Sequence, residues 1–189
     1  LARAGRVLGE ESWVRAAEKN LQFVRSRLWD PSTGTLYHRW RDGERDSVQL
    51  LDAYAFLLAG VLELYQVTLE AGHLEFAVAL AESMLARFQD REVGGFWQSG
   101  PGSTDLILRV KEDYDGAEPS GNSVAIQALL KLAAITERAE FREAAEKGLR
   151  LFASRMRQMA PGMTRMLLAL DFSLEPPRRV GLAGDLSGP

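Results

Sequence analysis

The sequence predicts an all-α protein that forms part of an (α/α) toroid, with about three helical hairpins and short β-hairpin insertions in its long loops. Three observations support this prediction. A pattern recurs about every 64 residues, amphipathic helices alternate with helices that are apolar almost all round, and long connections occur on only one side of each hairpin. Roughly six such hairpins close a ring, so three form about half of one.

The repeat is visible in two classes of segment. Residues 141–149 repeat the Ala-Ala-Glu-Lys pattern of residues 13–21, and residues 81–85 carry part of it halfway between them. Residues 130–136 likewise repeat the pattern of residues 62–68. One unit therefore holds two different helices, as stacked helical hairpins do.

The two classes differ in the arrangement of their apolar residues. Charges confined to one face indicate an outer helix, and an almost wholly apolar surface indicates a helix buried on most sides. The predicted outer helices are residues 12–28, 74–88 and 140–156. The predicted inner helices are residues 47–69 and 122–135, and residues 163–172 begin a third. Gly5 is the expected C-cap of an earlier helix.

The connections differ in length. Links from an inner to an outer helix are short, whereas the return links, residues 29–45 and 90–120, are long. Within the second of these, residues 106–111 are expected to pair with residues 95–99 as a β-hairpin across the Gly100-Pro101-Gly102 turn. Long loops gathered on one face of a rigid scaffold are a usual place for a binding site.

The two ends of the sequence indicate a fragment of a longer protein. The first residue is not Met, and Pro176-Pro177 interrupts the helical pattern. We expect residues 1–175 to form part of the toroid and residues 176–189 to begin a following, truncated segment. An incomplete ring leaves an apolar edge, which the remainder of the parent toroid or self-association would cover.

Composition excludes several kinds of site. The chain has 189 residues, a net charge of −3, two His and no Cys, so a disulfide or a thiolate site is impossible, and no metal or cofactor is expected. The Arg residues form no basic stripe, which argues against a nucleic-acid partner. The longest apolar run, residues 53–62, is about half of the ~20 residues that a membrane span needs. No signal peptide is visible, and the expected location is cytoplasmic.

Several stretches resemble those of a known family. Residues 51–57, followed by 60–65, match the family's Leu-Asp-Asp-Tyr-Ala-Phe-Leu helix, and residues 94–96 match its Gly-Gly-Phe-Phe loop. Residues 109–111 match its Arg-x-Lys pair, and residues 115–123 match its Asp-Gly-Ala-x-Pro-Ser-Gly-Asn-Ser stretch. The sequence thus resembles the spermatogenesis-associated protein 20 (YyaL-like) family, also described as domain of unknown function 255.

The resemblance implies a fold rather than an activity. Members resemble a thioredoxin-like domain followed by a six-hairpin glycosidase-like toroid, and the stretches above place this chain in the toroid. No redox function carries over, because the thioredoxin-like part is not in this sequence. The family's second Asp is Ala53 here, so any role of that carboxylate is lost. The family offers no assigned activity to transfer to residues.

Two acidic residues are the candidate catalytic groups. Asp52 lies early in an inner helix among apolar residues, and a buried carboxylate is costly unless it is paired or hydrogen-bonded. Two roles are open for Asp52. It acts as a general acid or base that faces the cavity of the toroid, or it is a first-turn acid that the helix dipole or a nearby loop amide stabilises. Asp115 forms with it the carboxylate pair of glycoside hydrolysis, or belongs only to an Asp-Gly turn.

Polar residues of the second long loop are candidate ligand-binding groups. Arg109 and Lys111 point the same way on a strand, and bind a carboxylate or phosphate or form a solvated face. Ser120 and Asn122 open the next inner helix, where they cap it, bind a hydroxylated or anionic ligand, or do both.

Aromatic residues are expected at the loop end of the toroid. They are Tyr37, Trp40, Tyr54 and Trp97. Aromatic rings suit stacking with a sugar, and they equally suit packing of the loops against the inner helices.

Two functions of different classes follow. The first is a carbohydrate-active or small-ligand-binding toroid of unassigned activity, with Asp52 and the loop aromatics at its cavity. The second is a non-catalytic helical-repeat interaction module of a thioredoxin-like multidomain protein. An Asp52 carboxylate fully satisfied by backbone amides would favour the second, and fold resemblance alone decides neither.

Overall fold

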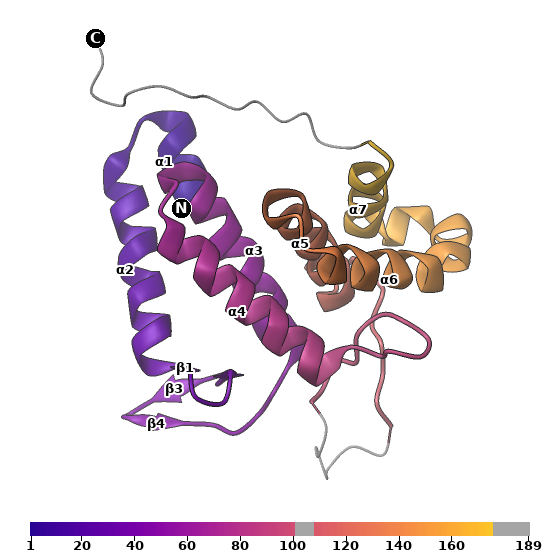
Figure 1. Cartoon of the computed structure of the whole chain (residues 1–189), viewed down its shortest axis with the longest axis horizontal. Helices are drawn as coiled ribbons and strands as arrows, with labels where there is room; N and C mark the ends of the chain where they lie inside the picture. The colour runs from indigo at the N-terminus through magenta and orange to yellow at the C-terminus, as the bar shows by residue number, and fades with distance from the viewer. Residues whose placement is uncertain (101–107, 176–189) are drawn as a thin grey trace.

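The computed structural model describes residues 1–100 and 108–175, and the described elements are helices joined by loops with short strands (Figure 1). The helices are α1 (Ala2–Leu8), α2 (Glu11–Arg27), α3 (Leu51–Thr68), α4 (Ala71–Phe88), α5 (Gly121–Thr136), α6 (Ala139–Gln158) and α7 (Thr164–Leu174), with a 3-10 turn at Ala160–Gly162. The strands are β1 (Trp29–Asp30), β2 (Thr35–Leu36), β3 (Trp40–Arg41) and β4 (Glu44–Arg45). The predicted all-α class with β-hairpins in a long loop is confirmed.

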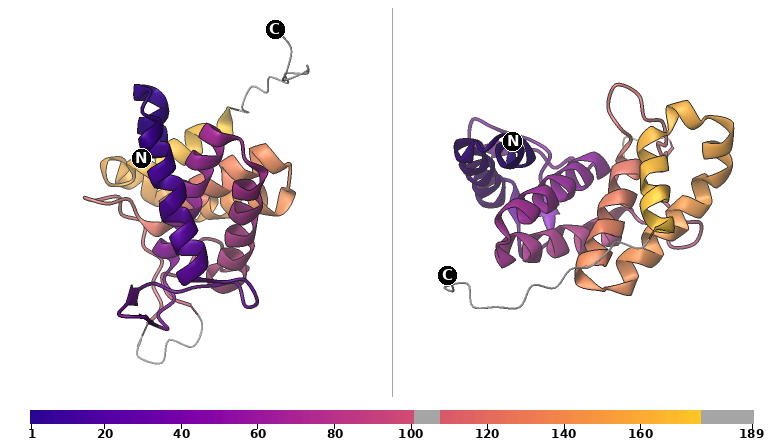
Figure 2. Two further views of the ribbon diagram at one scale, coloured as in Figure 1. Left: turned by 90° about the vertical axis from the view of Figure 1, so that its left-hand side faces the viewer. Right: turned by 90° about the horizontal axis from the view of Figure 1, so that it is seen from above.

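The helices form two layers. α3 packs along α1 on one side and along α5 on the other, and α5 also packs along α7, so these four helices form the inner row. α2, α4 and α6 each pack on the inner helix that precedes them in sequence. Figure 1 and Figure 2 show the hairpins following one another in sequence order across the molecule. The predicted neighbours α3 and α5 therefore lie side by side.

Burial separates the two layers as the sequence indicates. Tyr54, Ala55 and Leu58 of α3 are fully buried, and every residue from Gly121 to Leu130 of α5 is buried. In α2, by contrast, Leu21 is the one residue classed as buried. An apolar surface all round thus marks the inner helices, and a single apolar stripe marks the outer ones.

The inner helices α3 and α5 run parallel. Near their first turns, a Cβ added at Gly121 would collide with the carboxylate of Asp52, and near their far ends Lys131 Nζ lies 3.0 Å from Glu63 Oε1. Both helices therefore begin at the same end of the molecule. The strands β1, β3 and β4 lie at the lower end of Figure 1, where α2 and α4 end.

The start of the chain differs from the prediction. Gly5 lies inside α1, and Gly9 ends this helix with φ 74° while its N–H donates to the Gly5 carbonyl. A Cβ at Gly5 would lie 2.9 Å from both the Glu10 carbonyl and Val14, so Gly5 is required for the close approach of α1 and α2. The prediction that Gly5 is a C-cap is wrong.

The long connections contain the expected short pairings. β1 pairs with β2 through Trp29 and Leu36, and β3 pairs with β4. The expected pairing of residues 95–99 with residues 106–111 falls partly on residues outside the described part, but Gln98 N–H donates to the Val110 carbonyl at 2.8 Å. The predicted segment 176–189 also lies outside the described residues.

Helix α3 begins at Leu51 rather than at residue 47. Leu50 is extended and forms an antiparallel bridge with Ser99, and Gly100 N–H donates to the Gln49 carbonyl. These backbone groups pair with the second long loop and so cannot take part in the first turn of the helix. Among residues 1–100 and 108–175, no helix combines the length and apolarity needed to cross a membrane.

Candidate ligand site at the loop end of the inner helices

Three segments meet where α3 begins. Leu51 N–H donates to the Gln98 carbonyl at 3.0 Å, and Arg109 Nη2 donates to the Ser99 carbonyl at 2.8 Å. Together with the Gln98–Val110 bond, these contacts fix residues 97–100 between the start of α3 and residues 109–111. The backbone thus gathers side chains that are distant in sequence at one end of the inner row.

Asp52 occupies the first turn of α3 with its two oxygens in different surroundings. Oδ2 accepts a hydrogen bond of 2.6 Å from Gln98 Nε2. Oδ1 is buried against Gly121, at the start of α5, and has no hydrogen-bond partner among the described residues. Asp52 is therefore held by a side-chain amide, and within residues 1–100 and 108–175 no backbone amide bonds to it.

Other unpaired polar atoms lie next to Asp52. Among the described residues, six buried side-chain polar atoms have no hydrogen-bond partner, and four of them belong to adjoining residues of this region. These are Asp52 Oδ1, Gln98 Oε1, Ser99 Oγ and Arg109 Nε, and we call Asp52, Gln98, Ser99 and Arg109 the Asp52 cluster. An unpaired buried polar group costs about 1–3 kcal/mol, so such a concentration is unusual unless a ligand or water pairs with it.

Asp115 also lies at the start of α5, but both its oxygens are occupied by backbone amides. Oδ1 accepts from Ser120 N–H at 2.9 Å, and Oδ2 accepts from Arg165 N–H at 2.7 Å and from Met166 N–H at 3.1 Å. The last two amides belong to the first turn of α7, where helix amides otherwise lack partners. Asp115 thus ties the N-terminal ends of two inner helices together.

Ser120 and Asn122 likewise bond to the protein. Ser120 is the N-cap of α5, and its Oγ accepts from Ser123 N–H at 3.1 Å. Asn122 is fully buried; its Oδ1 accepts from Phe96 N–H at 2.8 Å, and its Nδ2 donates to the carbonyls of Phe96 and Glu112 at 2.9 Å each. Ser120 therefore caps the helix, and Asn122 fixes the loop that carries Trp97.

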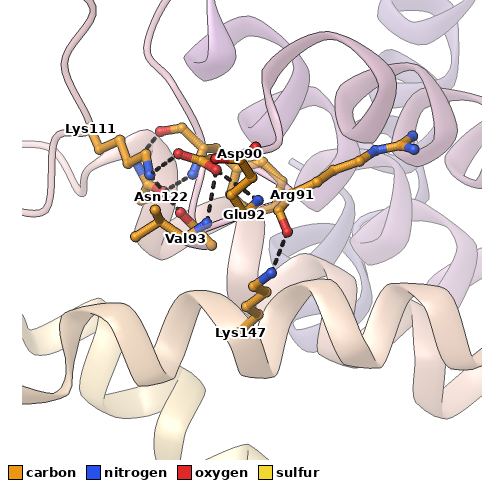
Figure 3. Close-up of polar contacts among 9 residues, drawn as sticks. Asp90, Arg91, Glu92, Val93, Lys111, Asn122 and Lys147 are labelled. Atoms are coloured by element: carbon orange, nitrogen blue, oxygen red, sulfur yellow. Dashed lines mark hydrogen bonds and ion pairs between the residues drawn. The ribbon is translucent and has the colours of Figure 1, made fainter.

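Lys111 bonds to the turn at residues 90–94, which leads into the same loop (Figure 3). Its Nζ donates to Asp90 Oδ2 at 2.8 Å and to the Gly94 carbonyl at 2.7 Å. The Lys111 hydrogen bond, followed by amides of the turn at Val93 and Glu92, lowers the pKa of Asp90 to about 2. In this turn, Lys111 serves as a fixed structural cation.

Trp97 is held between two cations. Arg109 Cζ lies 5.0 Å and Lys111 Nζ 4.4 Å from the centre of its ring. Both basic groups therefore face one residue, as their alternation in sequence predicts. Trp97 is partly exposed, and Arg109, a member of the Asp52 cluster, contacts its ring.

The other predicted aromatic residues are apart from this group. Tyr54 is fully buried against Phe88, its hydroxyl accepts from Leu36 N–H at 2.7 Å, and burial raises its pKa. Tyr37 lies under Arg45, whose Cζ is 4.9 Å from the ring centre. Trp40 packs edge-on against Phe23 at 5.6 Å.

Sequence reasoning missed Gln98, Ser99 and Phe56. Gln98 and Ser99 directly follow Trp97, and their position next to a candidate ligand-binding residue could have indicated them. Phe56 lies four residues after Asp52 on the same face of α3, a spacing that could have indicated it. Its side chain is 40% exposed although the helix is an inner one.

A cavity of about 510 Å³ lies elsewhere in the fold. It is bordered by α1, α2 and α3, with Leu21, Leu57, Gly60 and Val61 among its lining residues. Gly60 is about 12 Å along the helix from Asp52, given the rise of an α-helix. This cavity is therefore separate from the Asp52 cluster.

Comparison with solved structures identifies the fold. A cellobiose 2-epimerase from Spirochaeta thermophila matches with a TM-score of 0.62 and 22% identity, over 80% of this chain and 39% of the epimerase chain. A second one, from Bacillus thermoamylovorans, has the same TM-score at 18% identity. A family 76 glycoside hydrolase (mannosidase) from Bacteroides thetaiotaomicron matches with a TM-score of 0.54 and 18% identity, over 68% of this chain and 34% of that chain. The chain thus has the fold of α/α toroid enzymes of the six-hairpin glycosidase-like class.

Sequence comparison addresses the family. No family model matches the chain. Spermatogenesis-associated protein 20 of Rattus norvegicus is 33% identical over 97% of the chain, and that of Homo sapiens is 31% identical over the same share. The chain spans about a quarter of the length of these curated relatives, 24% and 25% respectively. Over nearly its whole length, this chain is therefore a relative of the spermatogenesis-associated protein 20 family, as the motifs of its inner helices and loops predict.

Proposed function

We propose that the loop end of the inner helices binds a carbohydrate, with the Asp52 cluster contacting its hydroxyl groups and Asp52 acting as a general acid or base. The observation that carries the proposal is that four unpaired buried polar atoms belong to residues that hydrogen bonds and the chain link at this end of the inner helices. A carboxylate oxygen and an amide oxygen accept hydrogen bonds, a guanidinium N–H donates, and a serine hydroxyl does either. Neighbouring sugar hydroxyls, which both donate and accept, match this set.

The surroundings of the cluster support the same ligand class. Arg109 and Lys111 both contact the ring of Trp97 and fix it, and the part of the ring that stays exposed is a preformed surface for a sugar. In this proposal Arg109 contacts the ligand through Nε, while Lys111, Ser120, Asn122 and Asp115 position the loops. Tyr37, Trp40 and Tyr54 remain predictions as ligand contacts, and Tyr54 is the least suited because it is fully buried.

The fold is compatible with this proposal. The solved structures that share it include proteins named for action on cellobiose and on mannosides, which are carbohydrates. A shared fold does not transfer an activity, so its weight here is that this scaffold can form a sugar site. The non-catalytic interaction module is the less favoured alternative. It would be favoured by an Asp52 carboxylate bonded to backbone amides, whereas among the described residues the partner of Asp52 is the Gln98 side chain and its Oδ1 is unpaired.

The test is sugar binding by the natural protein that carries this chain. Calorimetric titration with neutral mono- and disaccharides, cellobiose and mannobiose among them, is expected to find a ligand. Asp52→Asn is expected to abolish binding or turnover, because it replaces an acceptor with a donor within the cluster. Asp171→Asn, an exposed Asp of α7, is the matched control and should bind normally. Unchanged affinity of Asp52→Asn would overturn the proposal.

A further inference from the structure

Phe56 is an exposed apolar side chain on an inner helix. Its side chain is 40% exposed, whereas the neighbouring Tyr54, Ala55 and Leu58 are fully buried. An exposed phenyl group on an inner helix is not accounted for by the packing of α3 on α1, α4 and α5. It leaves an apolar ring on the one face of α3 that the described elements do not cover.

This face of α3 begins with Asp52. Residues four apart lie one above the other on a helix, so Asp52 and Phe56 share a face and are separated by about 6 Å along the axis. Gly60 follows at the same spacing, and a Cβ added there would meet no atom within 4 Å. This face of α3 therefore holds Asp52, whose Oδ1 is buried at the start of α5, then the exposed ring of Phe56, and then Gly60, which lines the cavity between α1, α2 and α3.

We propose that the ring of a bound sugar lies on the phenyl ring of Phe56 while its hydroxyl edge reaches the Asp52 cluster; this inference rests on the proposed function and narrows its ligand to a neutral pyranose. A pyranose has a face of C–H groups and an edge of hydroxyl groups. The face of a phenyl ring is electronegative and attracts C–H groups, whereas a linear polyol offers no flat face. The cluster combines one carboxylate, Asp52, with one guanidinium, Arg109, so it offers no net positive charge to hold a uronate.

A second phenylalanine with almost the same exposure provides a comparison. Phe23, on outer helix α2, is 41% exposed and packs edge-on against Trp40 at 5.6 Å. Among the described residues, no ring-to-ring contact involves Phe56. The face of Phe23 thus has an aromatic neighbour in the protein, and the ring of Phe56 has none.

The experiment uses the natural protein and the tightest neutral sugar from the titrations above. Phe56→Leu is expected to bind about three- to tenfold more weakly, which is the range of one aromatic contact, whereas Phe56→Tyr keeps the ring and should bind like wild type. Phe23→Leu is the matched control and should leave affinity unchanged. In proton NMR of the wild-type complex, C–H protons on one face of the sugar should shift upfield, and this shift should vanish in Phe56→Leu.

The outcomes separate this inference from the function on which it rests. If wild type binds a neutral sugar and Phe56→Leu binds it as tightly as Phe23→Leu does, Phe56 is not the platform and the proposed function stands. Binding of a uronate more tightly than of the matching neutral sugar would overturn the ligand class. If wild type binds no sugar, both proposals are wrong. Should Phe56→Leu fail to fold, the wild-type spectrum decides, since an absent upfield shift contradicts stacking.

Discussion

At the scale of single residues, the contrast between Asp52 and Asp115 decides how the site is understood. Asp52 is in the first turn of α3 and lies against the first residue of α5. Asp115 is in the loop that leads into α5. Asp115 accepts three backbone N–H groups, whereas Asp52 accepts one side-chain amide and keeps a buried, unpaired oxygen. A carboxylate whose acceptor capacity is used by the fold serves the fold, and one left unpaired is available for a ligand.

The first prediction concerns the stability of the two Asn variants. Asp115→Asn should lower the free energy of unfolding by about 1–3 kcal/mol, because an amide cannot accept on both sides and leaves helix N–H groups of α7 unpaired. Asp52→Asn should leave stability nearly intact, since one oxygen of Asp52 has no partner to lose. Urea unfolding of both variants measures this. The reverse order of stabilities would show Asp52 to be the structural residue.

The second prediction concerns acid. Asp90 has its folded-state pKa lowered from 3.8 to about 2, chiefly by the Lys111 hydrogen bond. A lowered pKa means that the stabilisation is complete above the unfolded-state value and is lost as pH falls from about 4 through 2. Because this turn is near the surface, the contribution is on the order of 1 kcal/mol after solvent screening.

Lys111→Met isolates this contribution. Wild type should exceed it in unfolding free energy by a constant amount from pH 7 to about pH 5, and the gap should narrow as pH falls toward about 2. Urea unfolding at a series of pH values gives both curves. A gap that stays constant at low pH would show that the charge of Asp90 is not involved.

At the scale of elements, glycines show where helices touch and where they do not. Gly148 of α6 faces α5, and a Cβ there would lie 2.7 Å from Ile126 Cδ1. Gly60 of α3 has open space instead. A glycine inside a helix costs about 0.5–1 kcal/mol relative to alanine, so packing justifies Gly148 but not Gly60.

The third prediction follows from this pair. Gly60→Ala should raise the free energy of unfolding by about 0.5–1 kcal/mol, because the helix gains propensity without a clash. Gly148→Ala should lower it, because α5 and α6 must move apart. Thermal unfolding of the two variants provides the comparison. A destabilised Gly60→Ala would mean that a segment beyond the described residues packs on this face.

The helices can be predicted from the sequence more completely than the contacts between them. Periodicity records which faces are buried, so the inner and outer classes of α2 to α6 follow from it directly. The start of α3 does not, because Leu50 pairs with Ser99, almost fifty residues away. The partner of Asp52 is Gln98, at a similar distance in sequence, and no local pattern encodes that pair. Asp52 was thus predictable as a candidate, and its cluster was not.

At the scale of the whole molecule, the hairpins form an open row rather than a closed ring. α7 packs on α5 and α6, and it also carries Leu168 and Leu174, which are 54% and 72% exposed. At the opposite end of the row, Val7 and Leu8 of α1 are 73% and 64% exposed. The chain covers 39% of the epimerase with which it shares its fold and about a quarter of its curated relatives, so those longer proteins have further chain that could cover such edges.

The fourth prediction is that these 189 residues, expressed alone, self-associate through the edge formed by α7. Exposed apolar side chains favour association in proportion to the area that they bury. Sedimentation velocity should show an association that rises with concentration, and Leu168→Lys should weaken it because a charge would be buried in the contact. Gln22→Lys, at an exposed position of outer helix α2, adds the same charge as Leu168→Lys and is the matched control, which should associate as wild type does. A chain that stays monomeric at all concentrations would show that the edge is stable in water, and that the rest of a toroid is not needed to cover it.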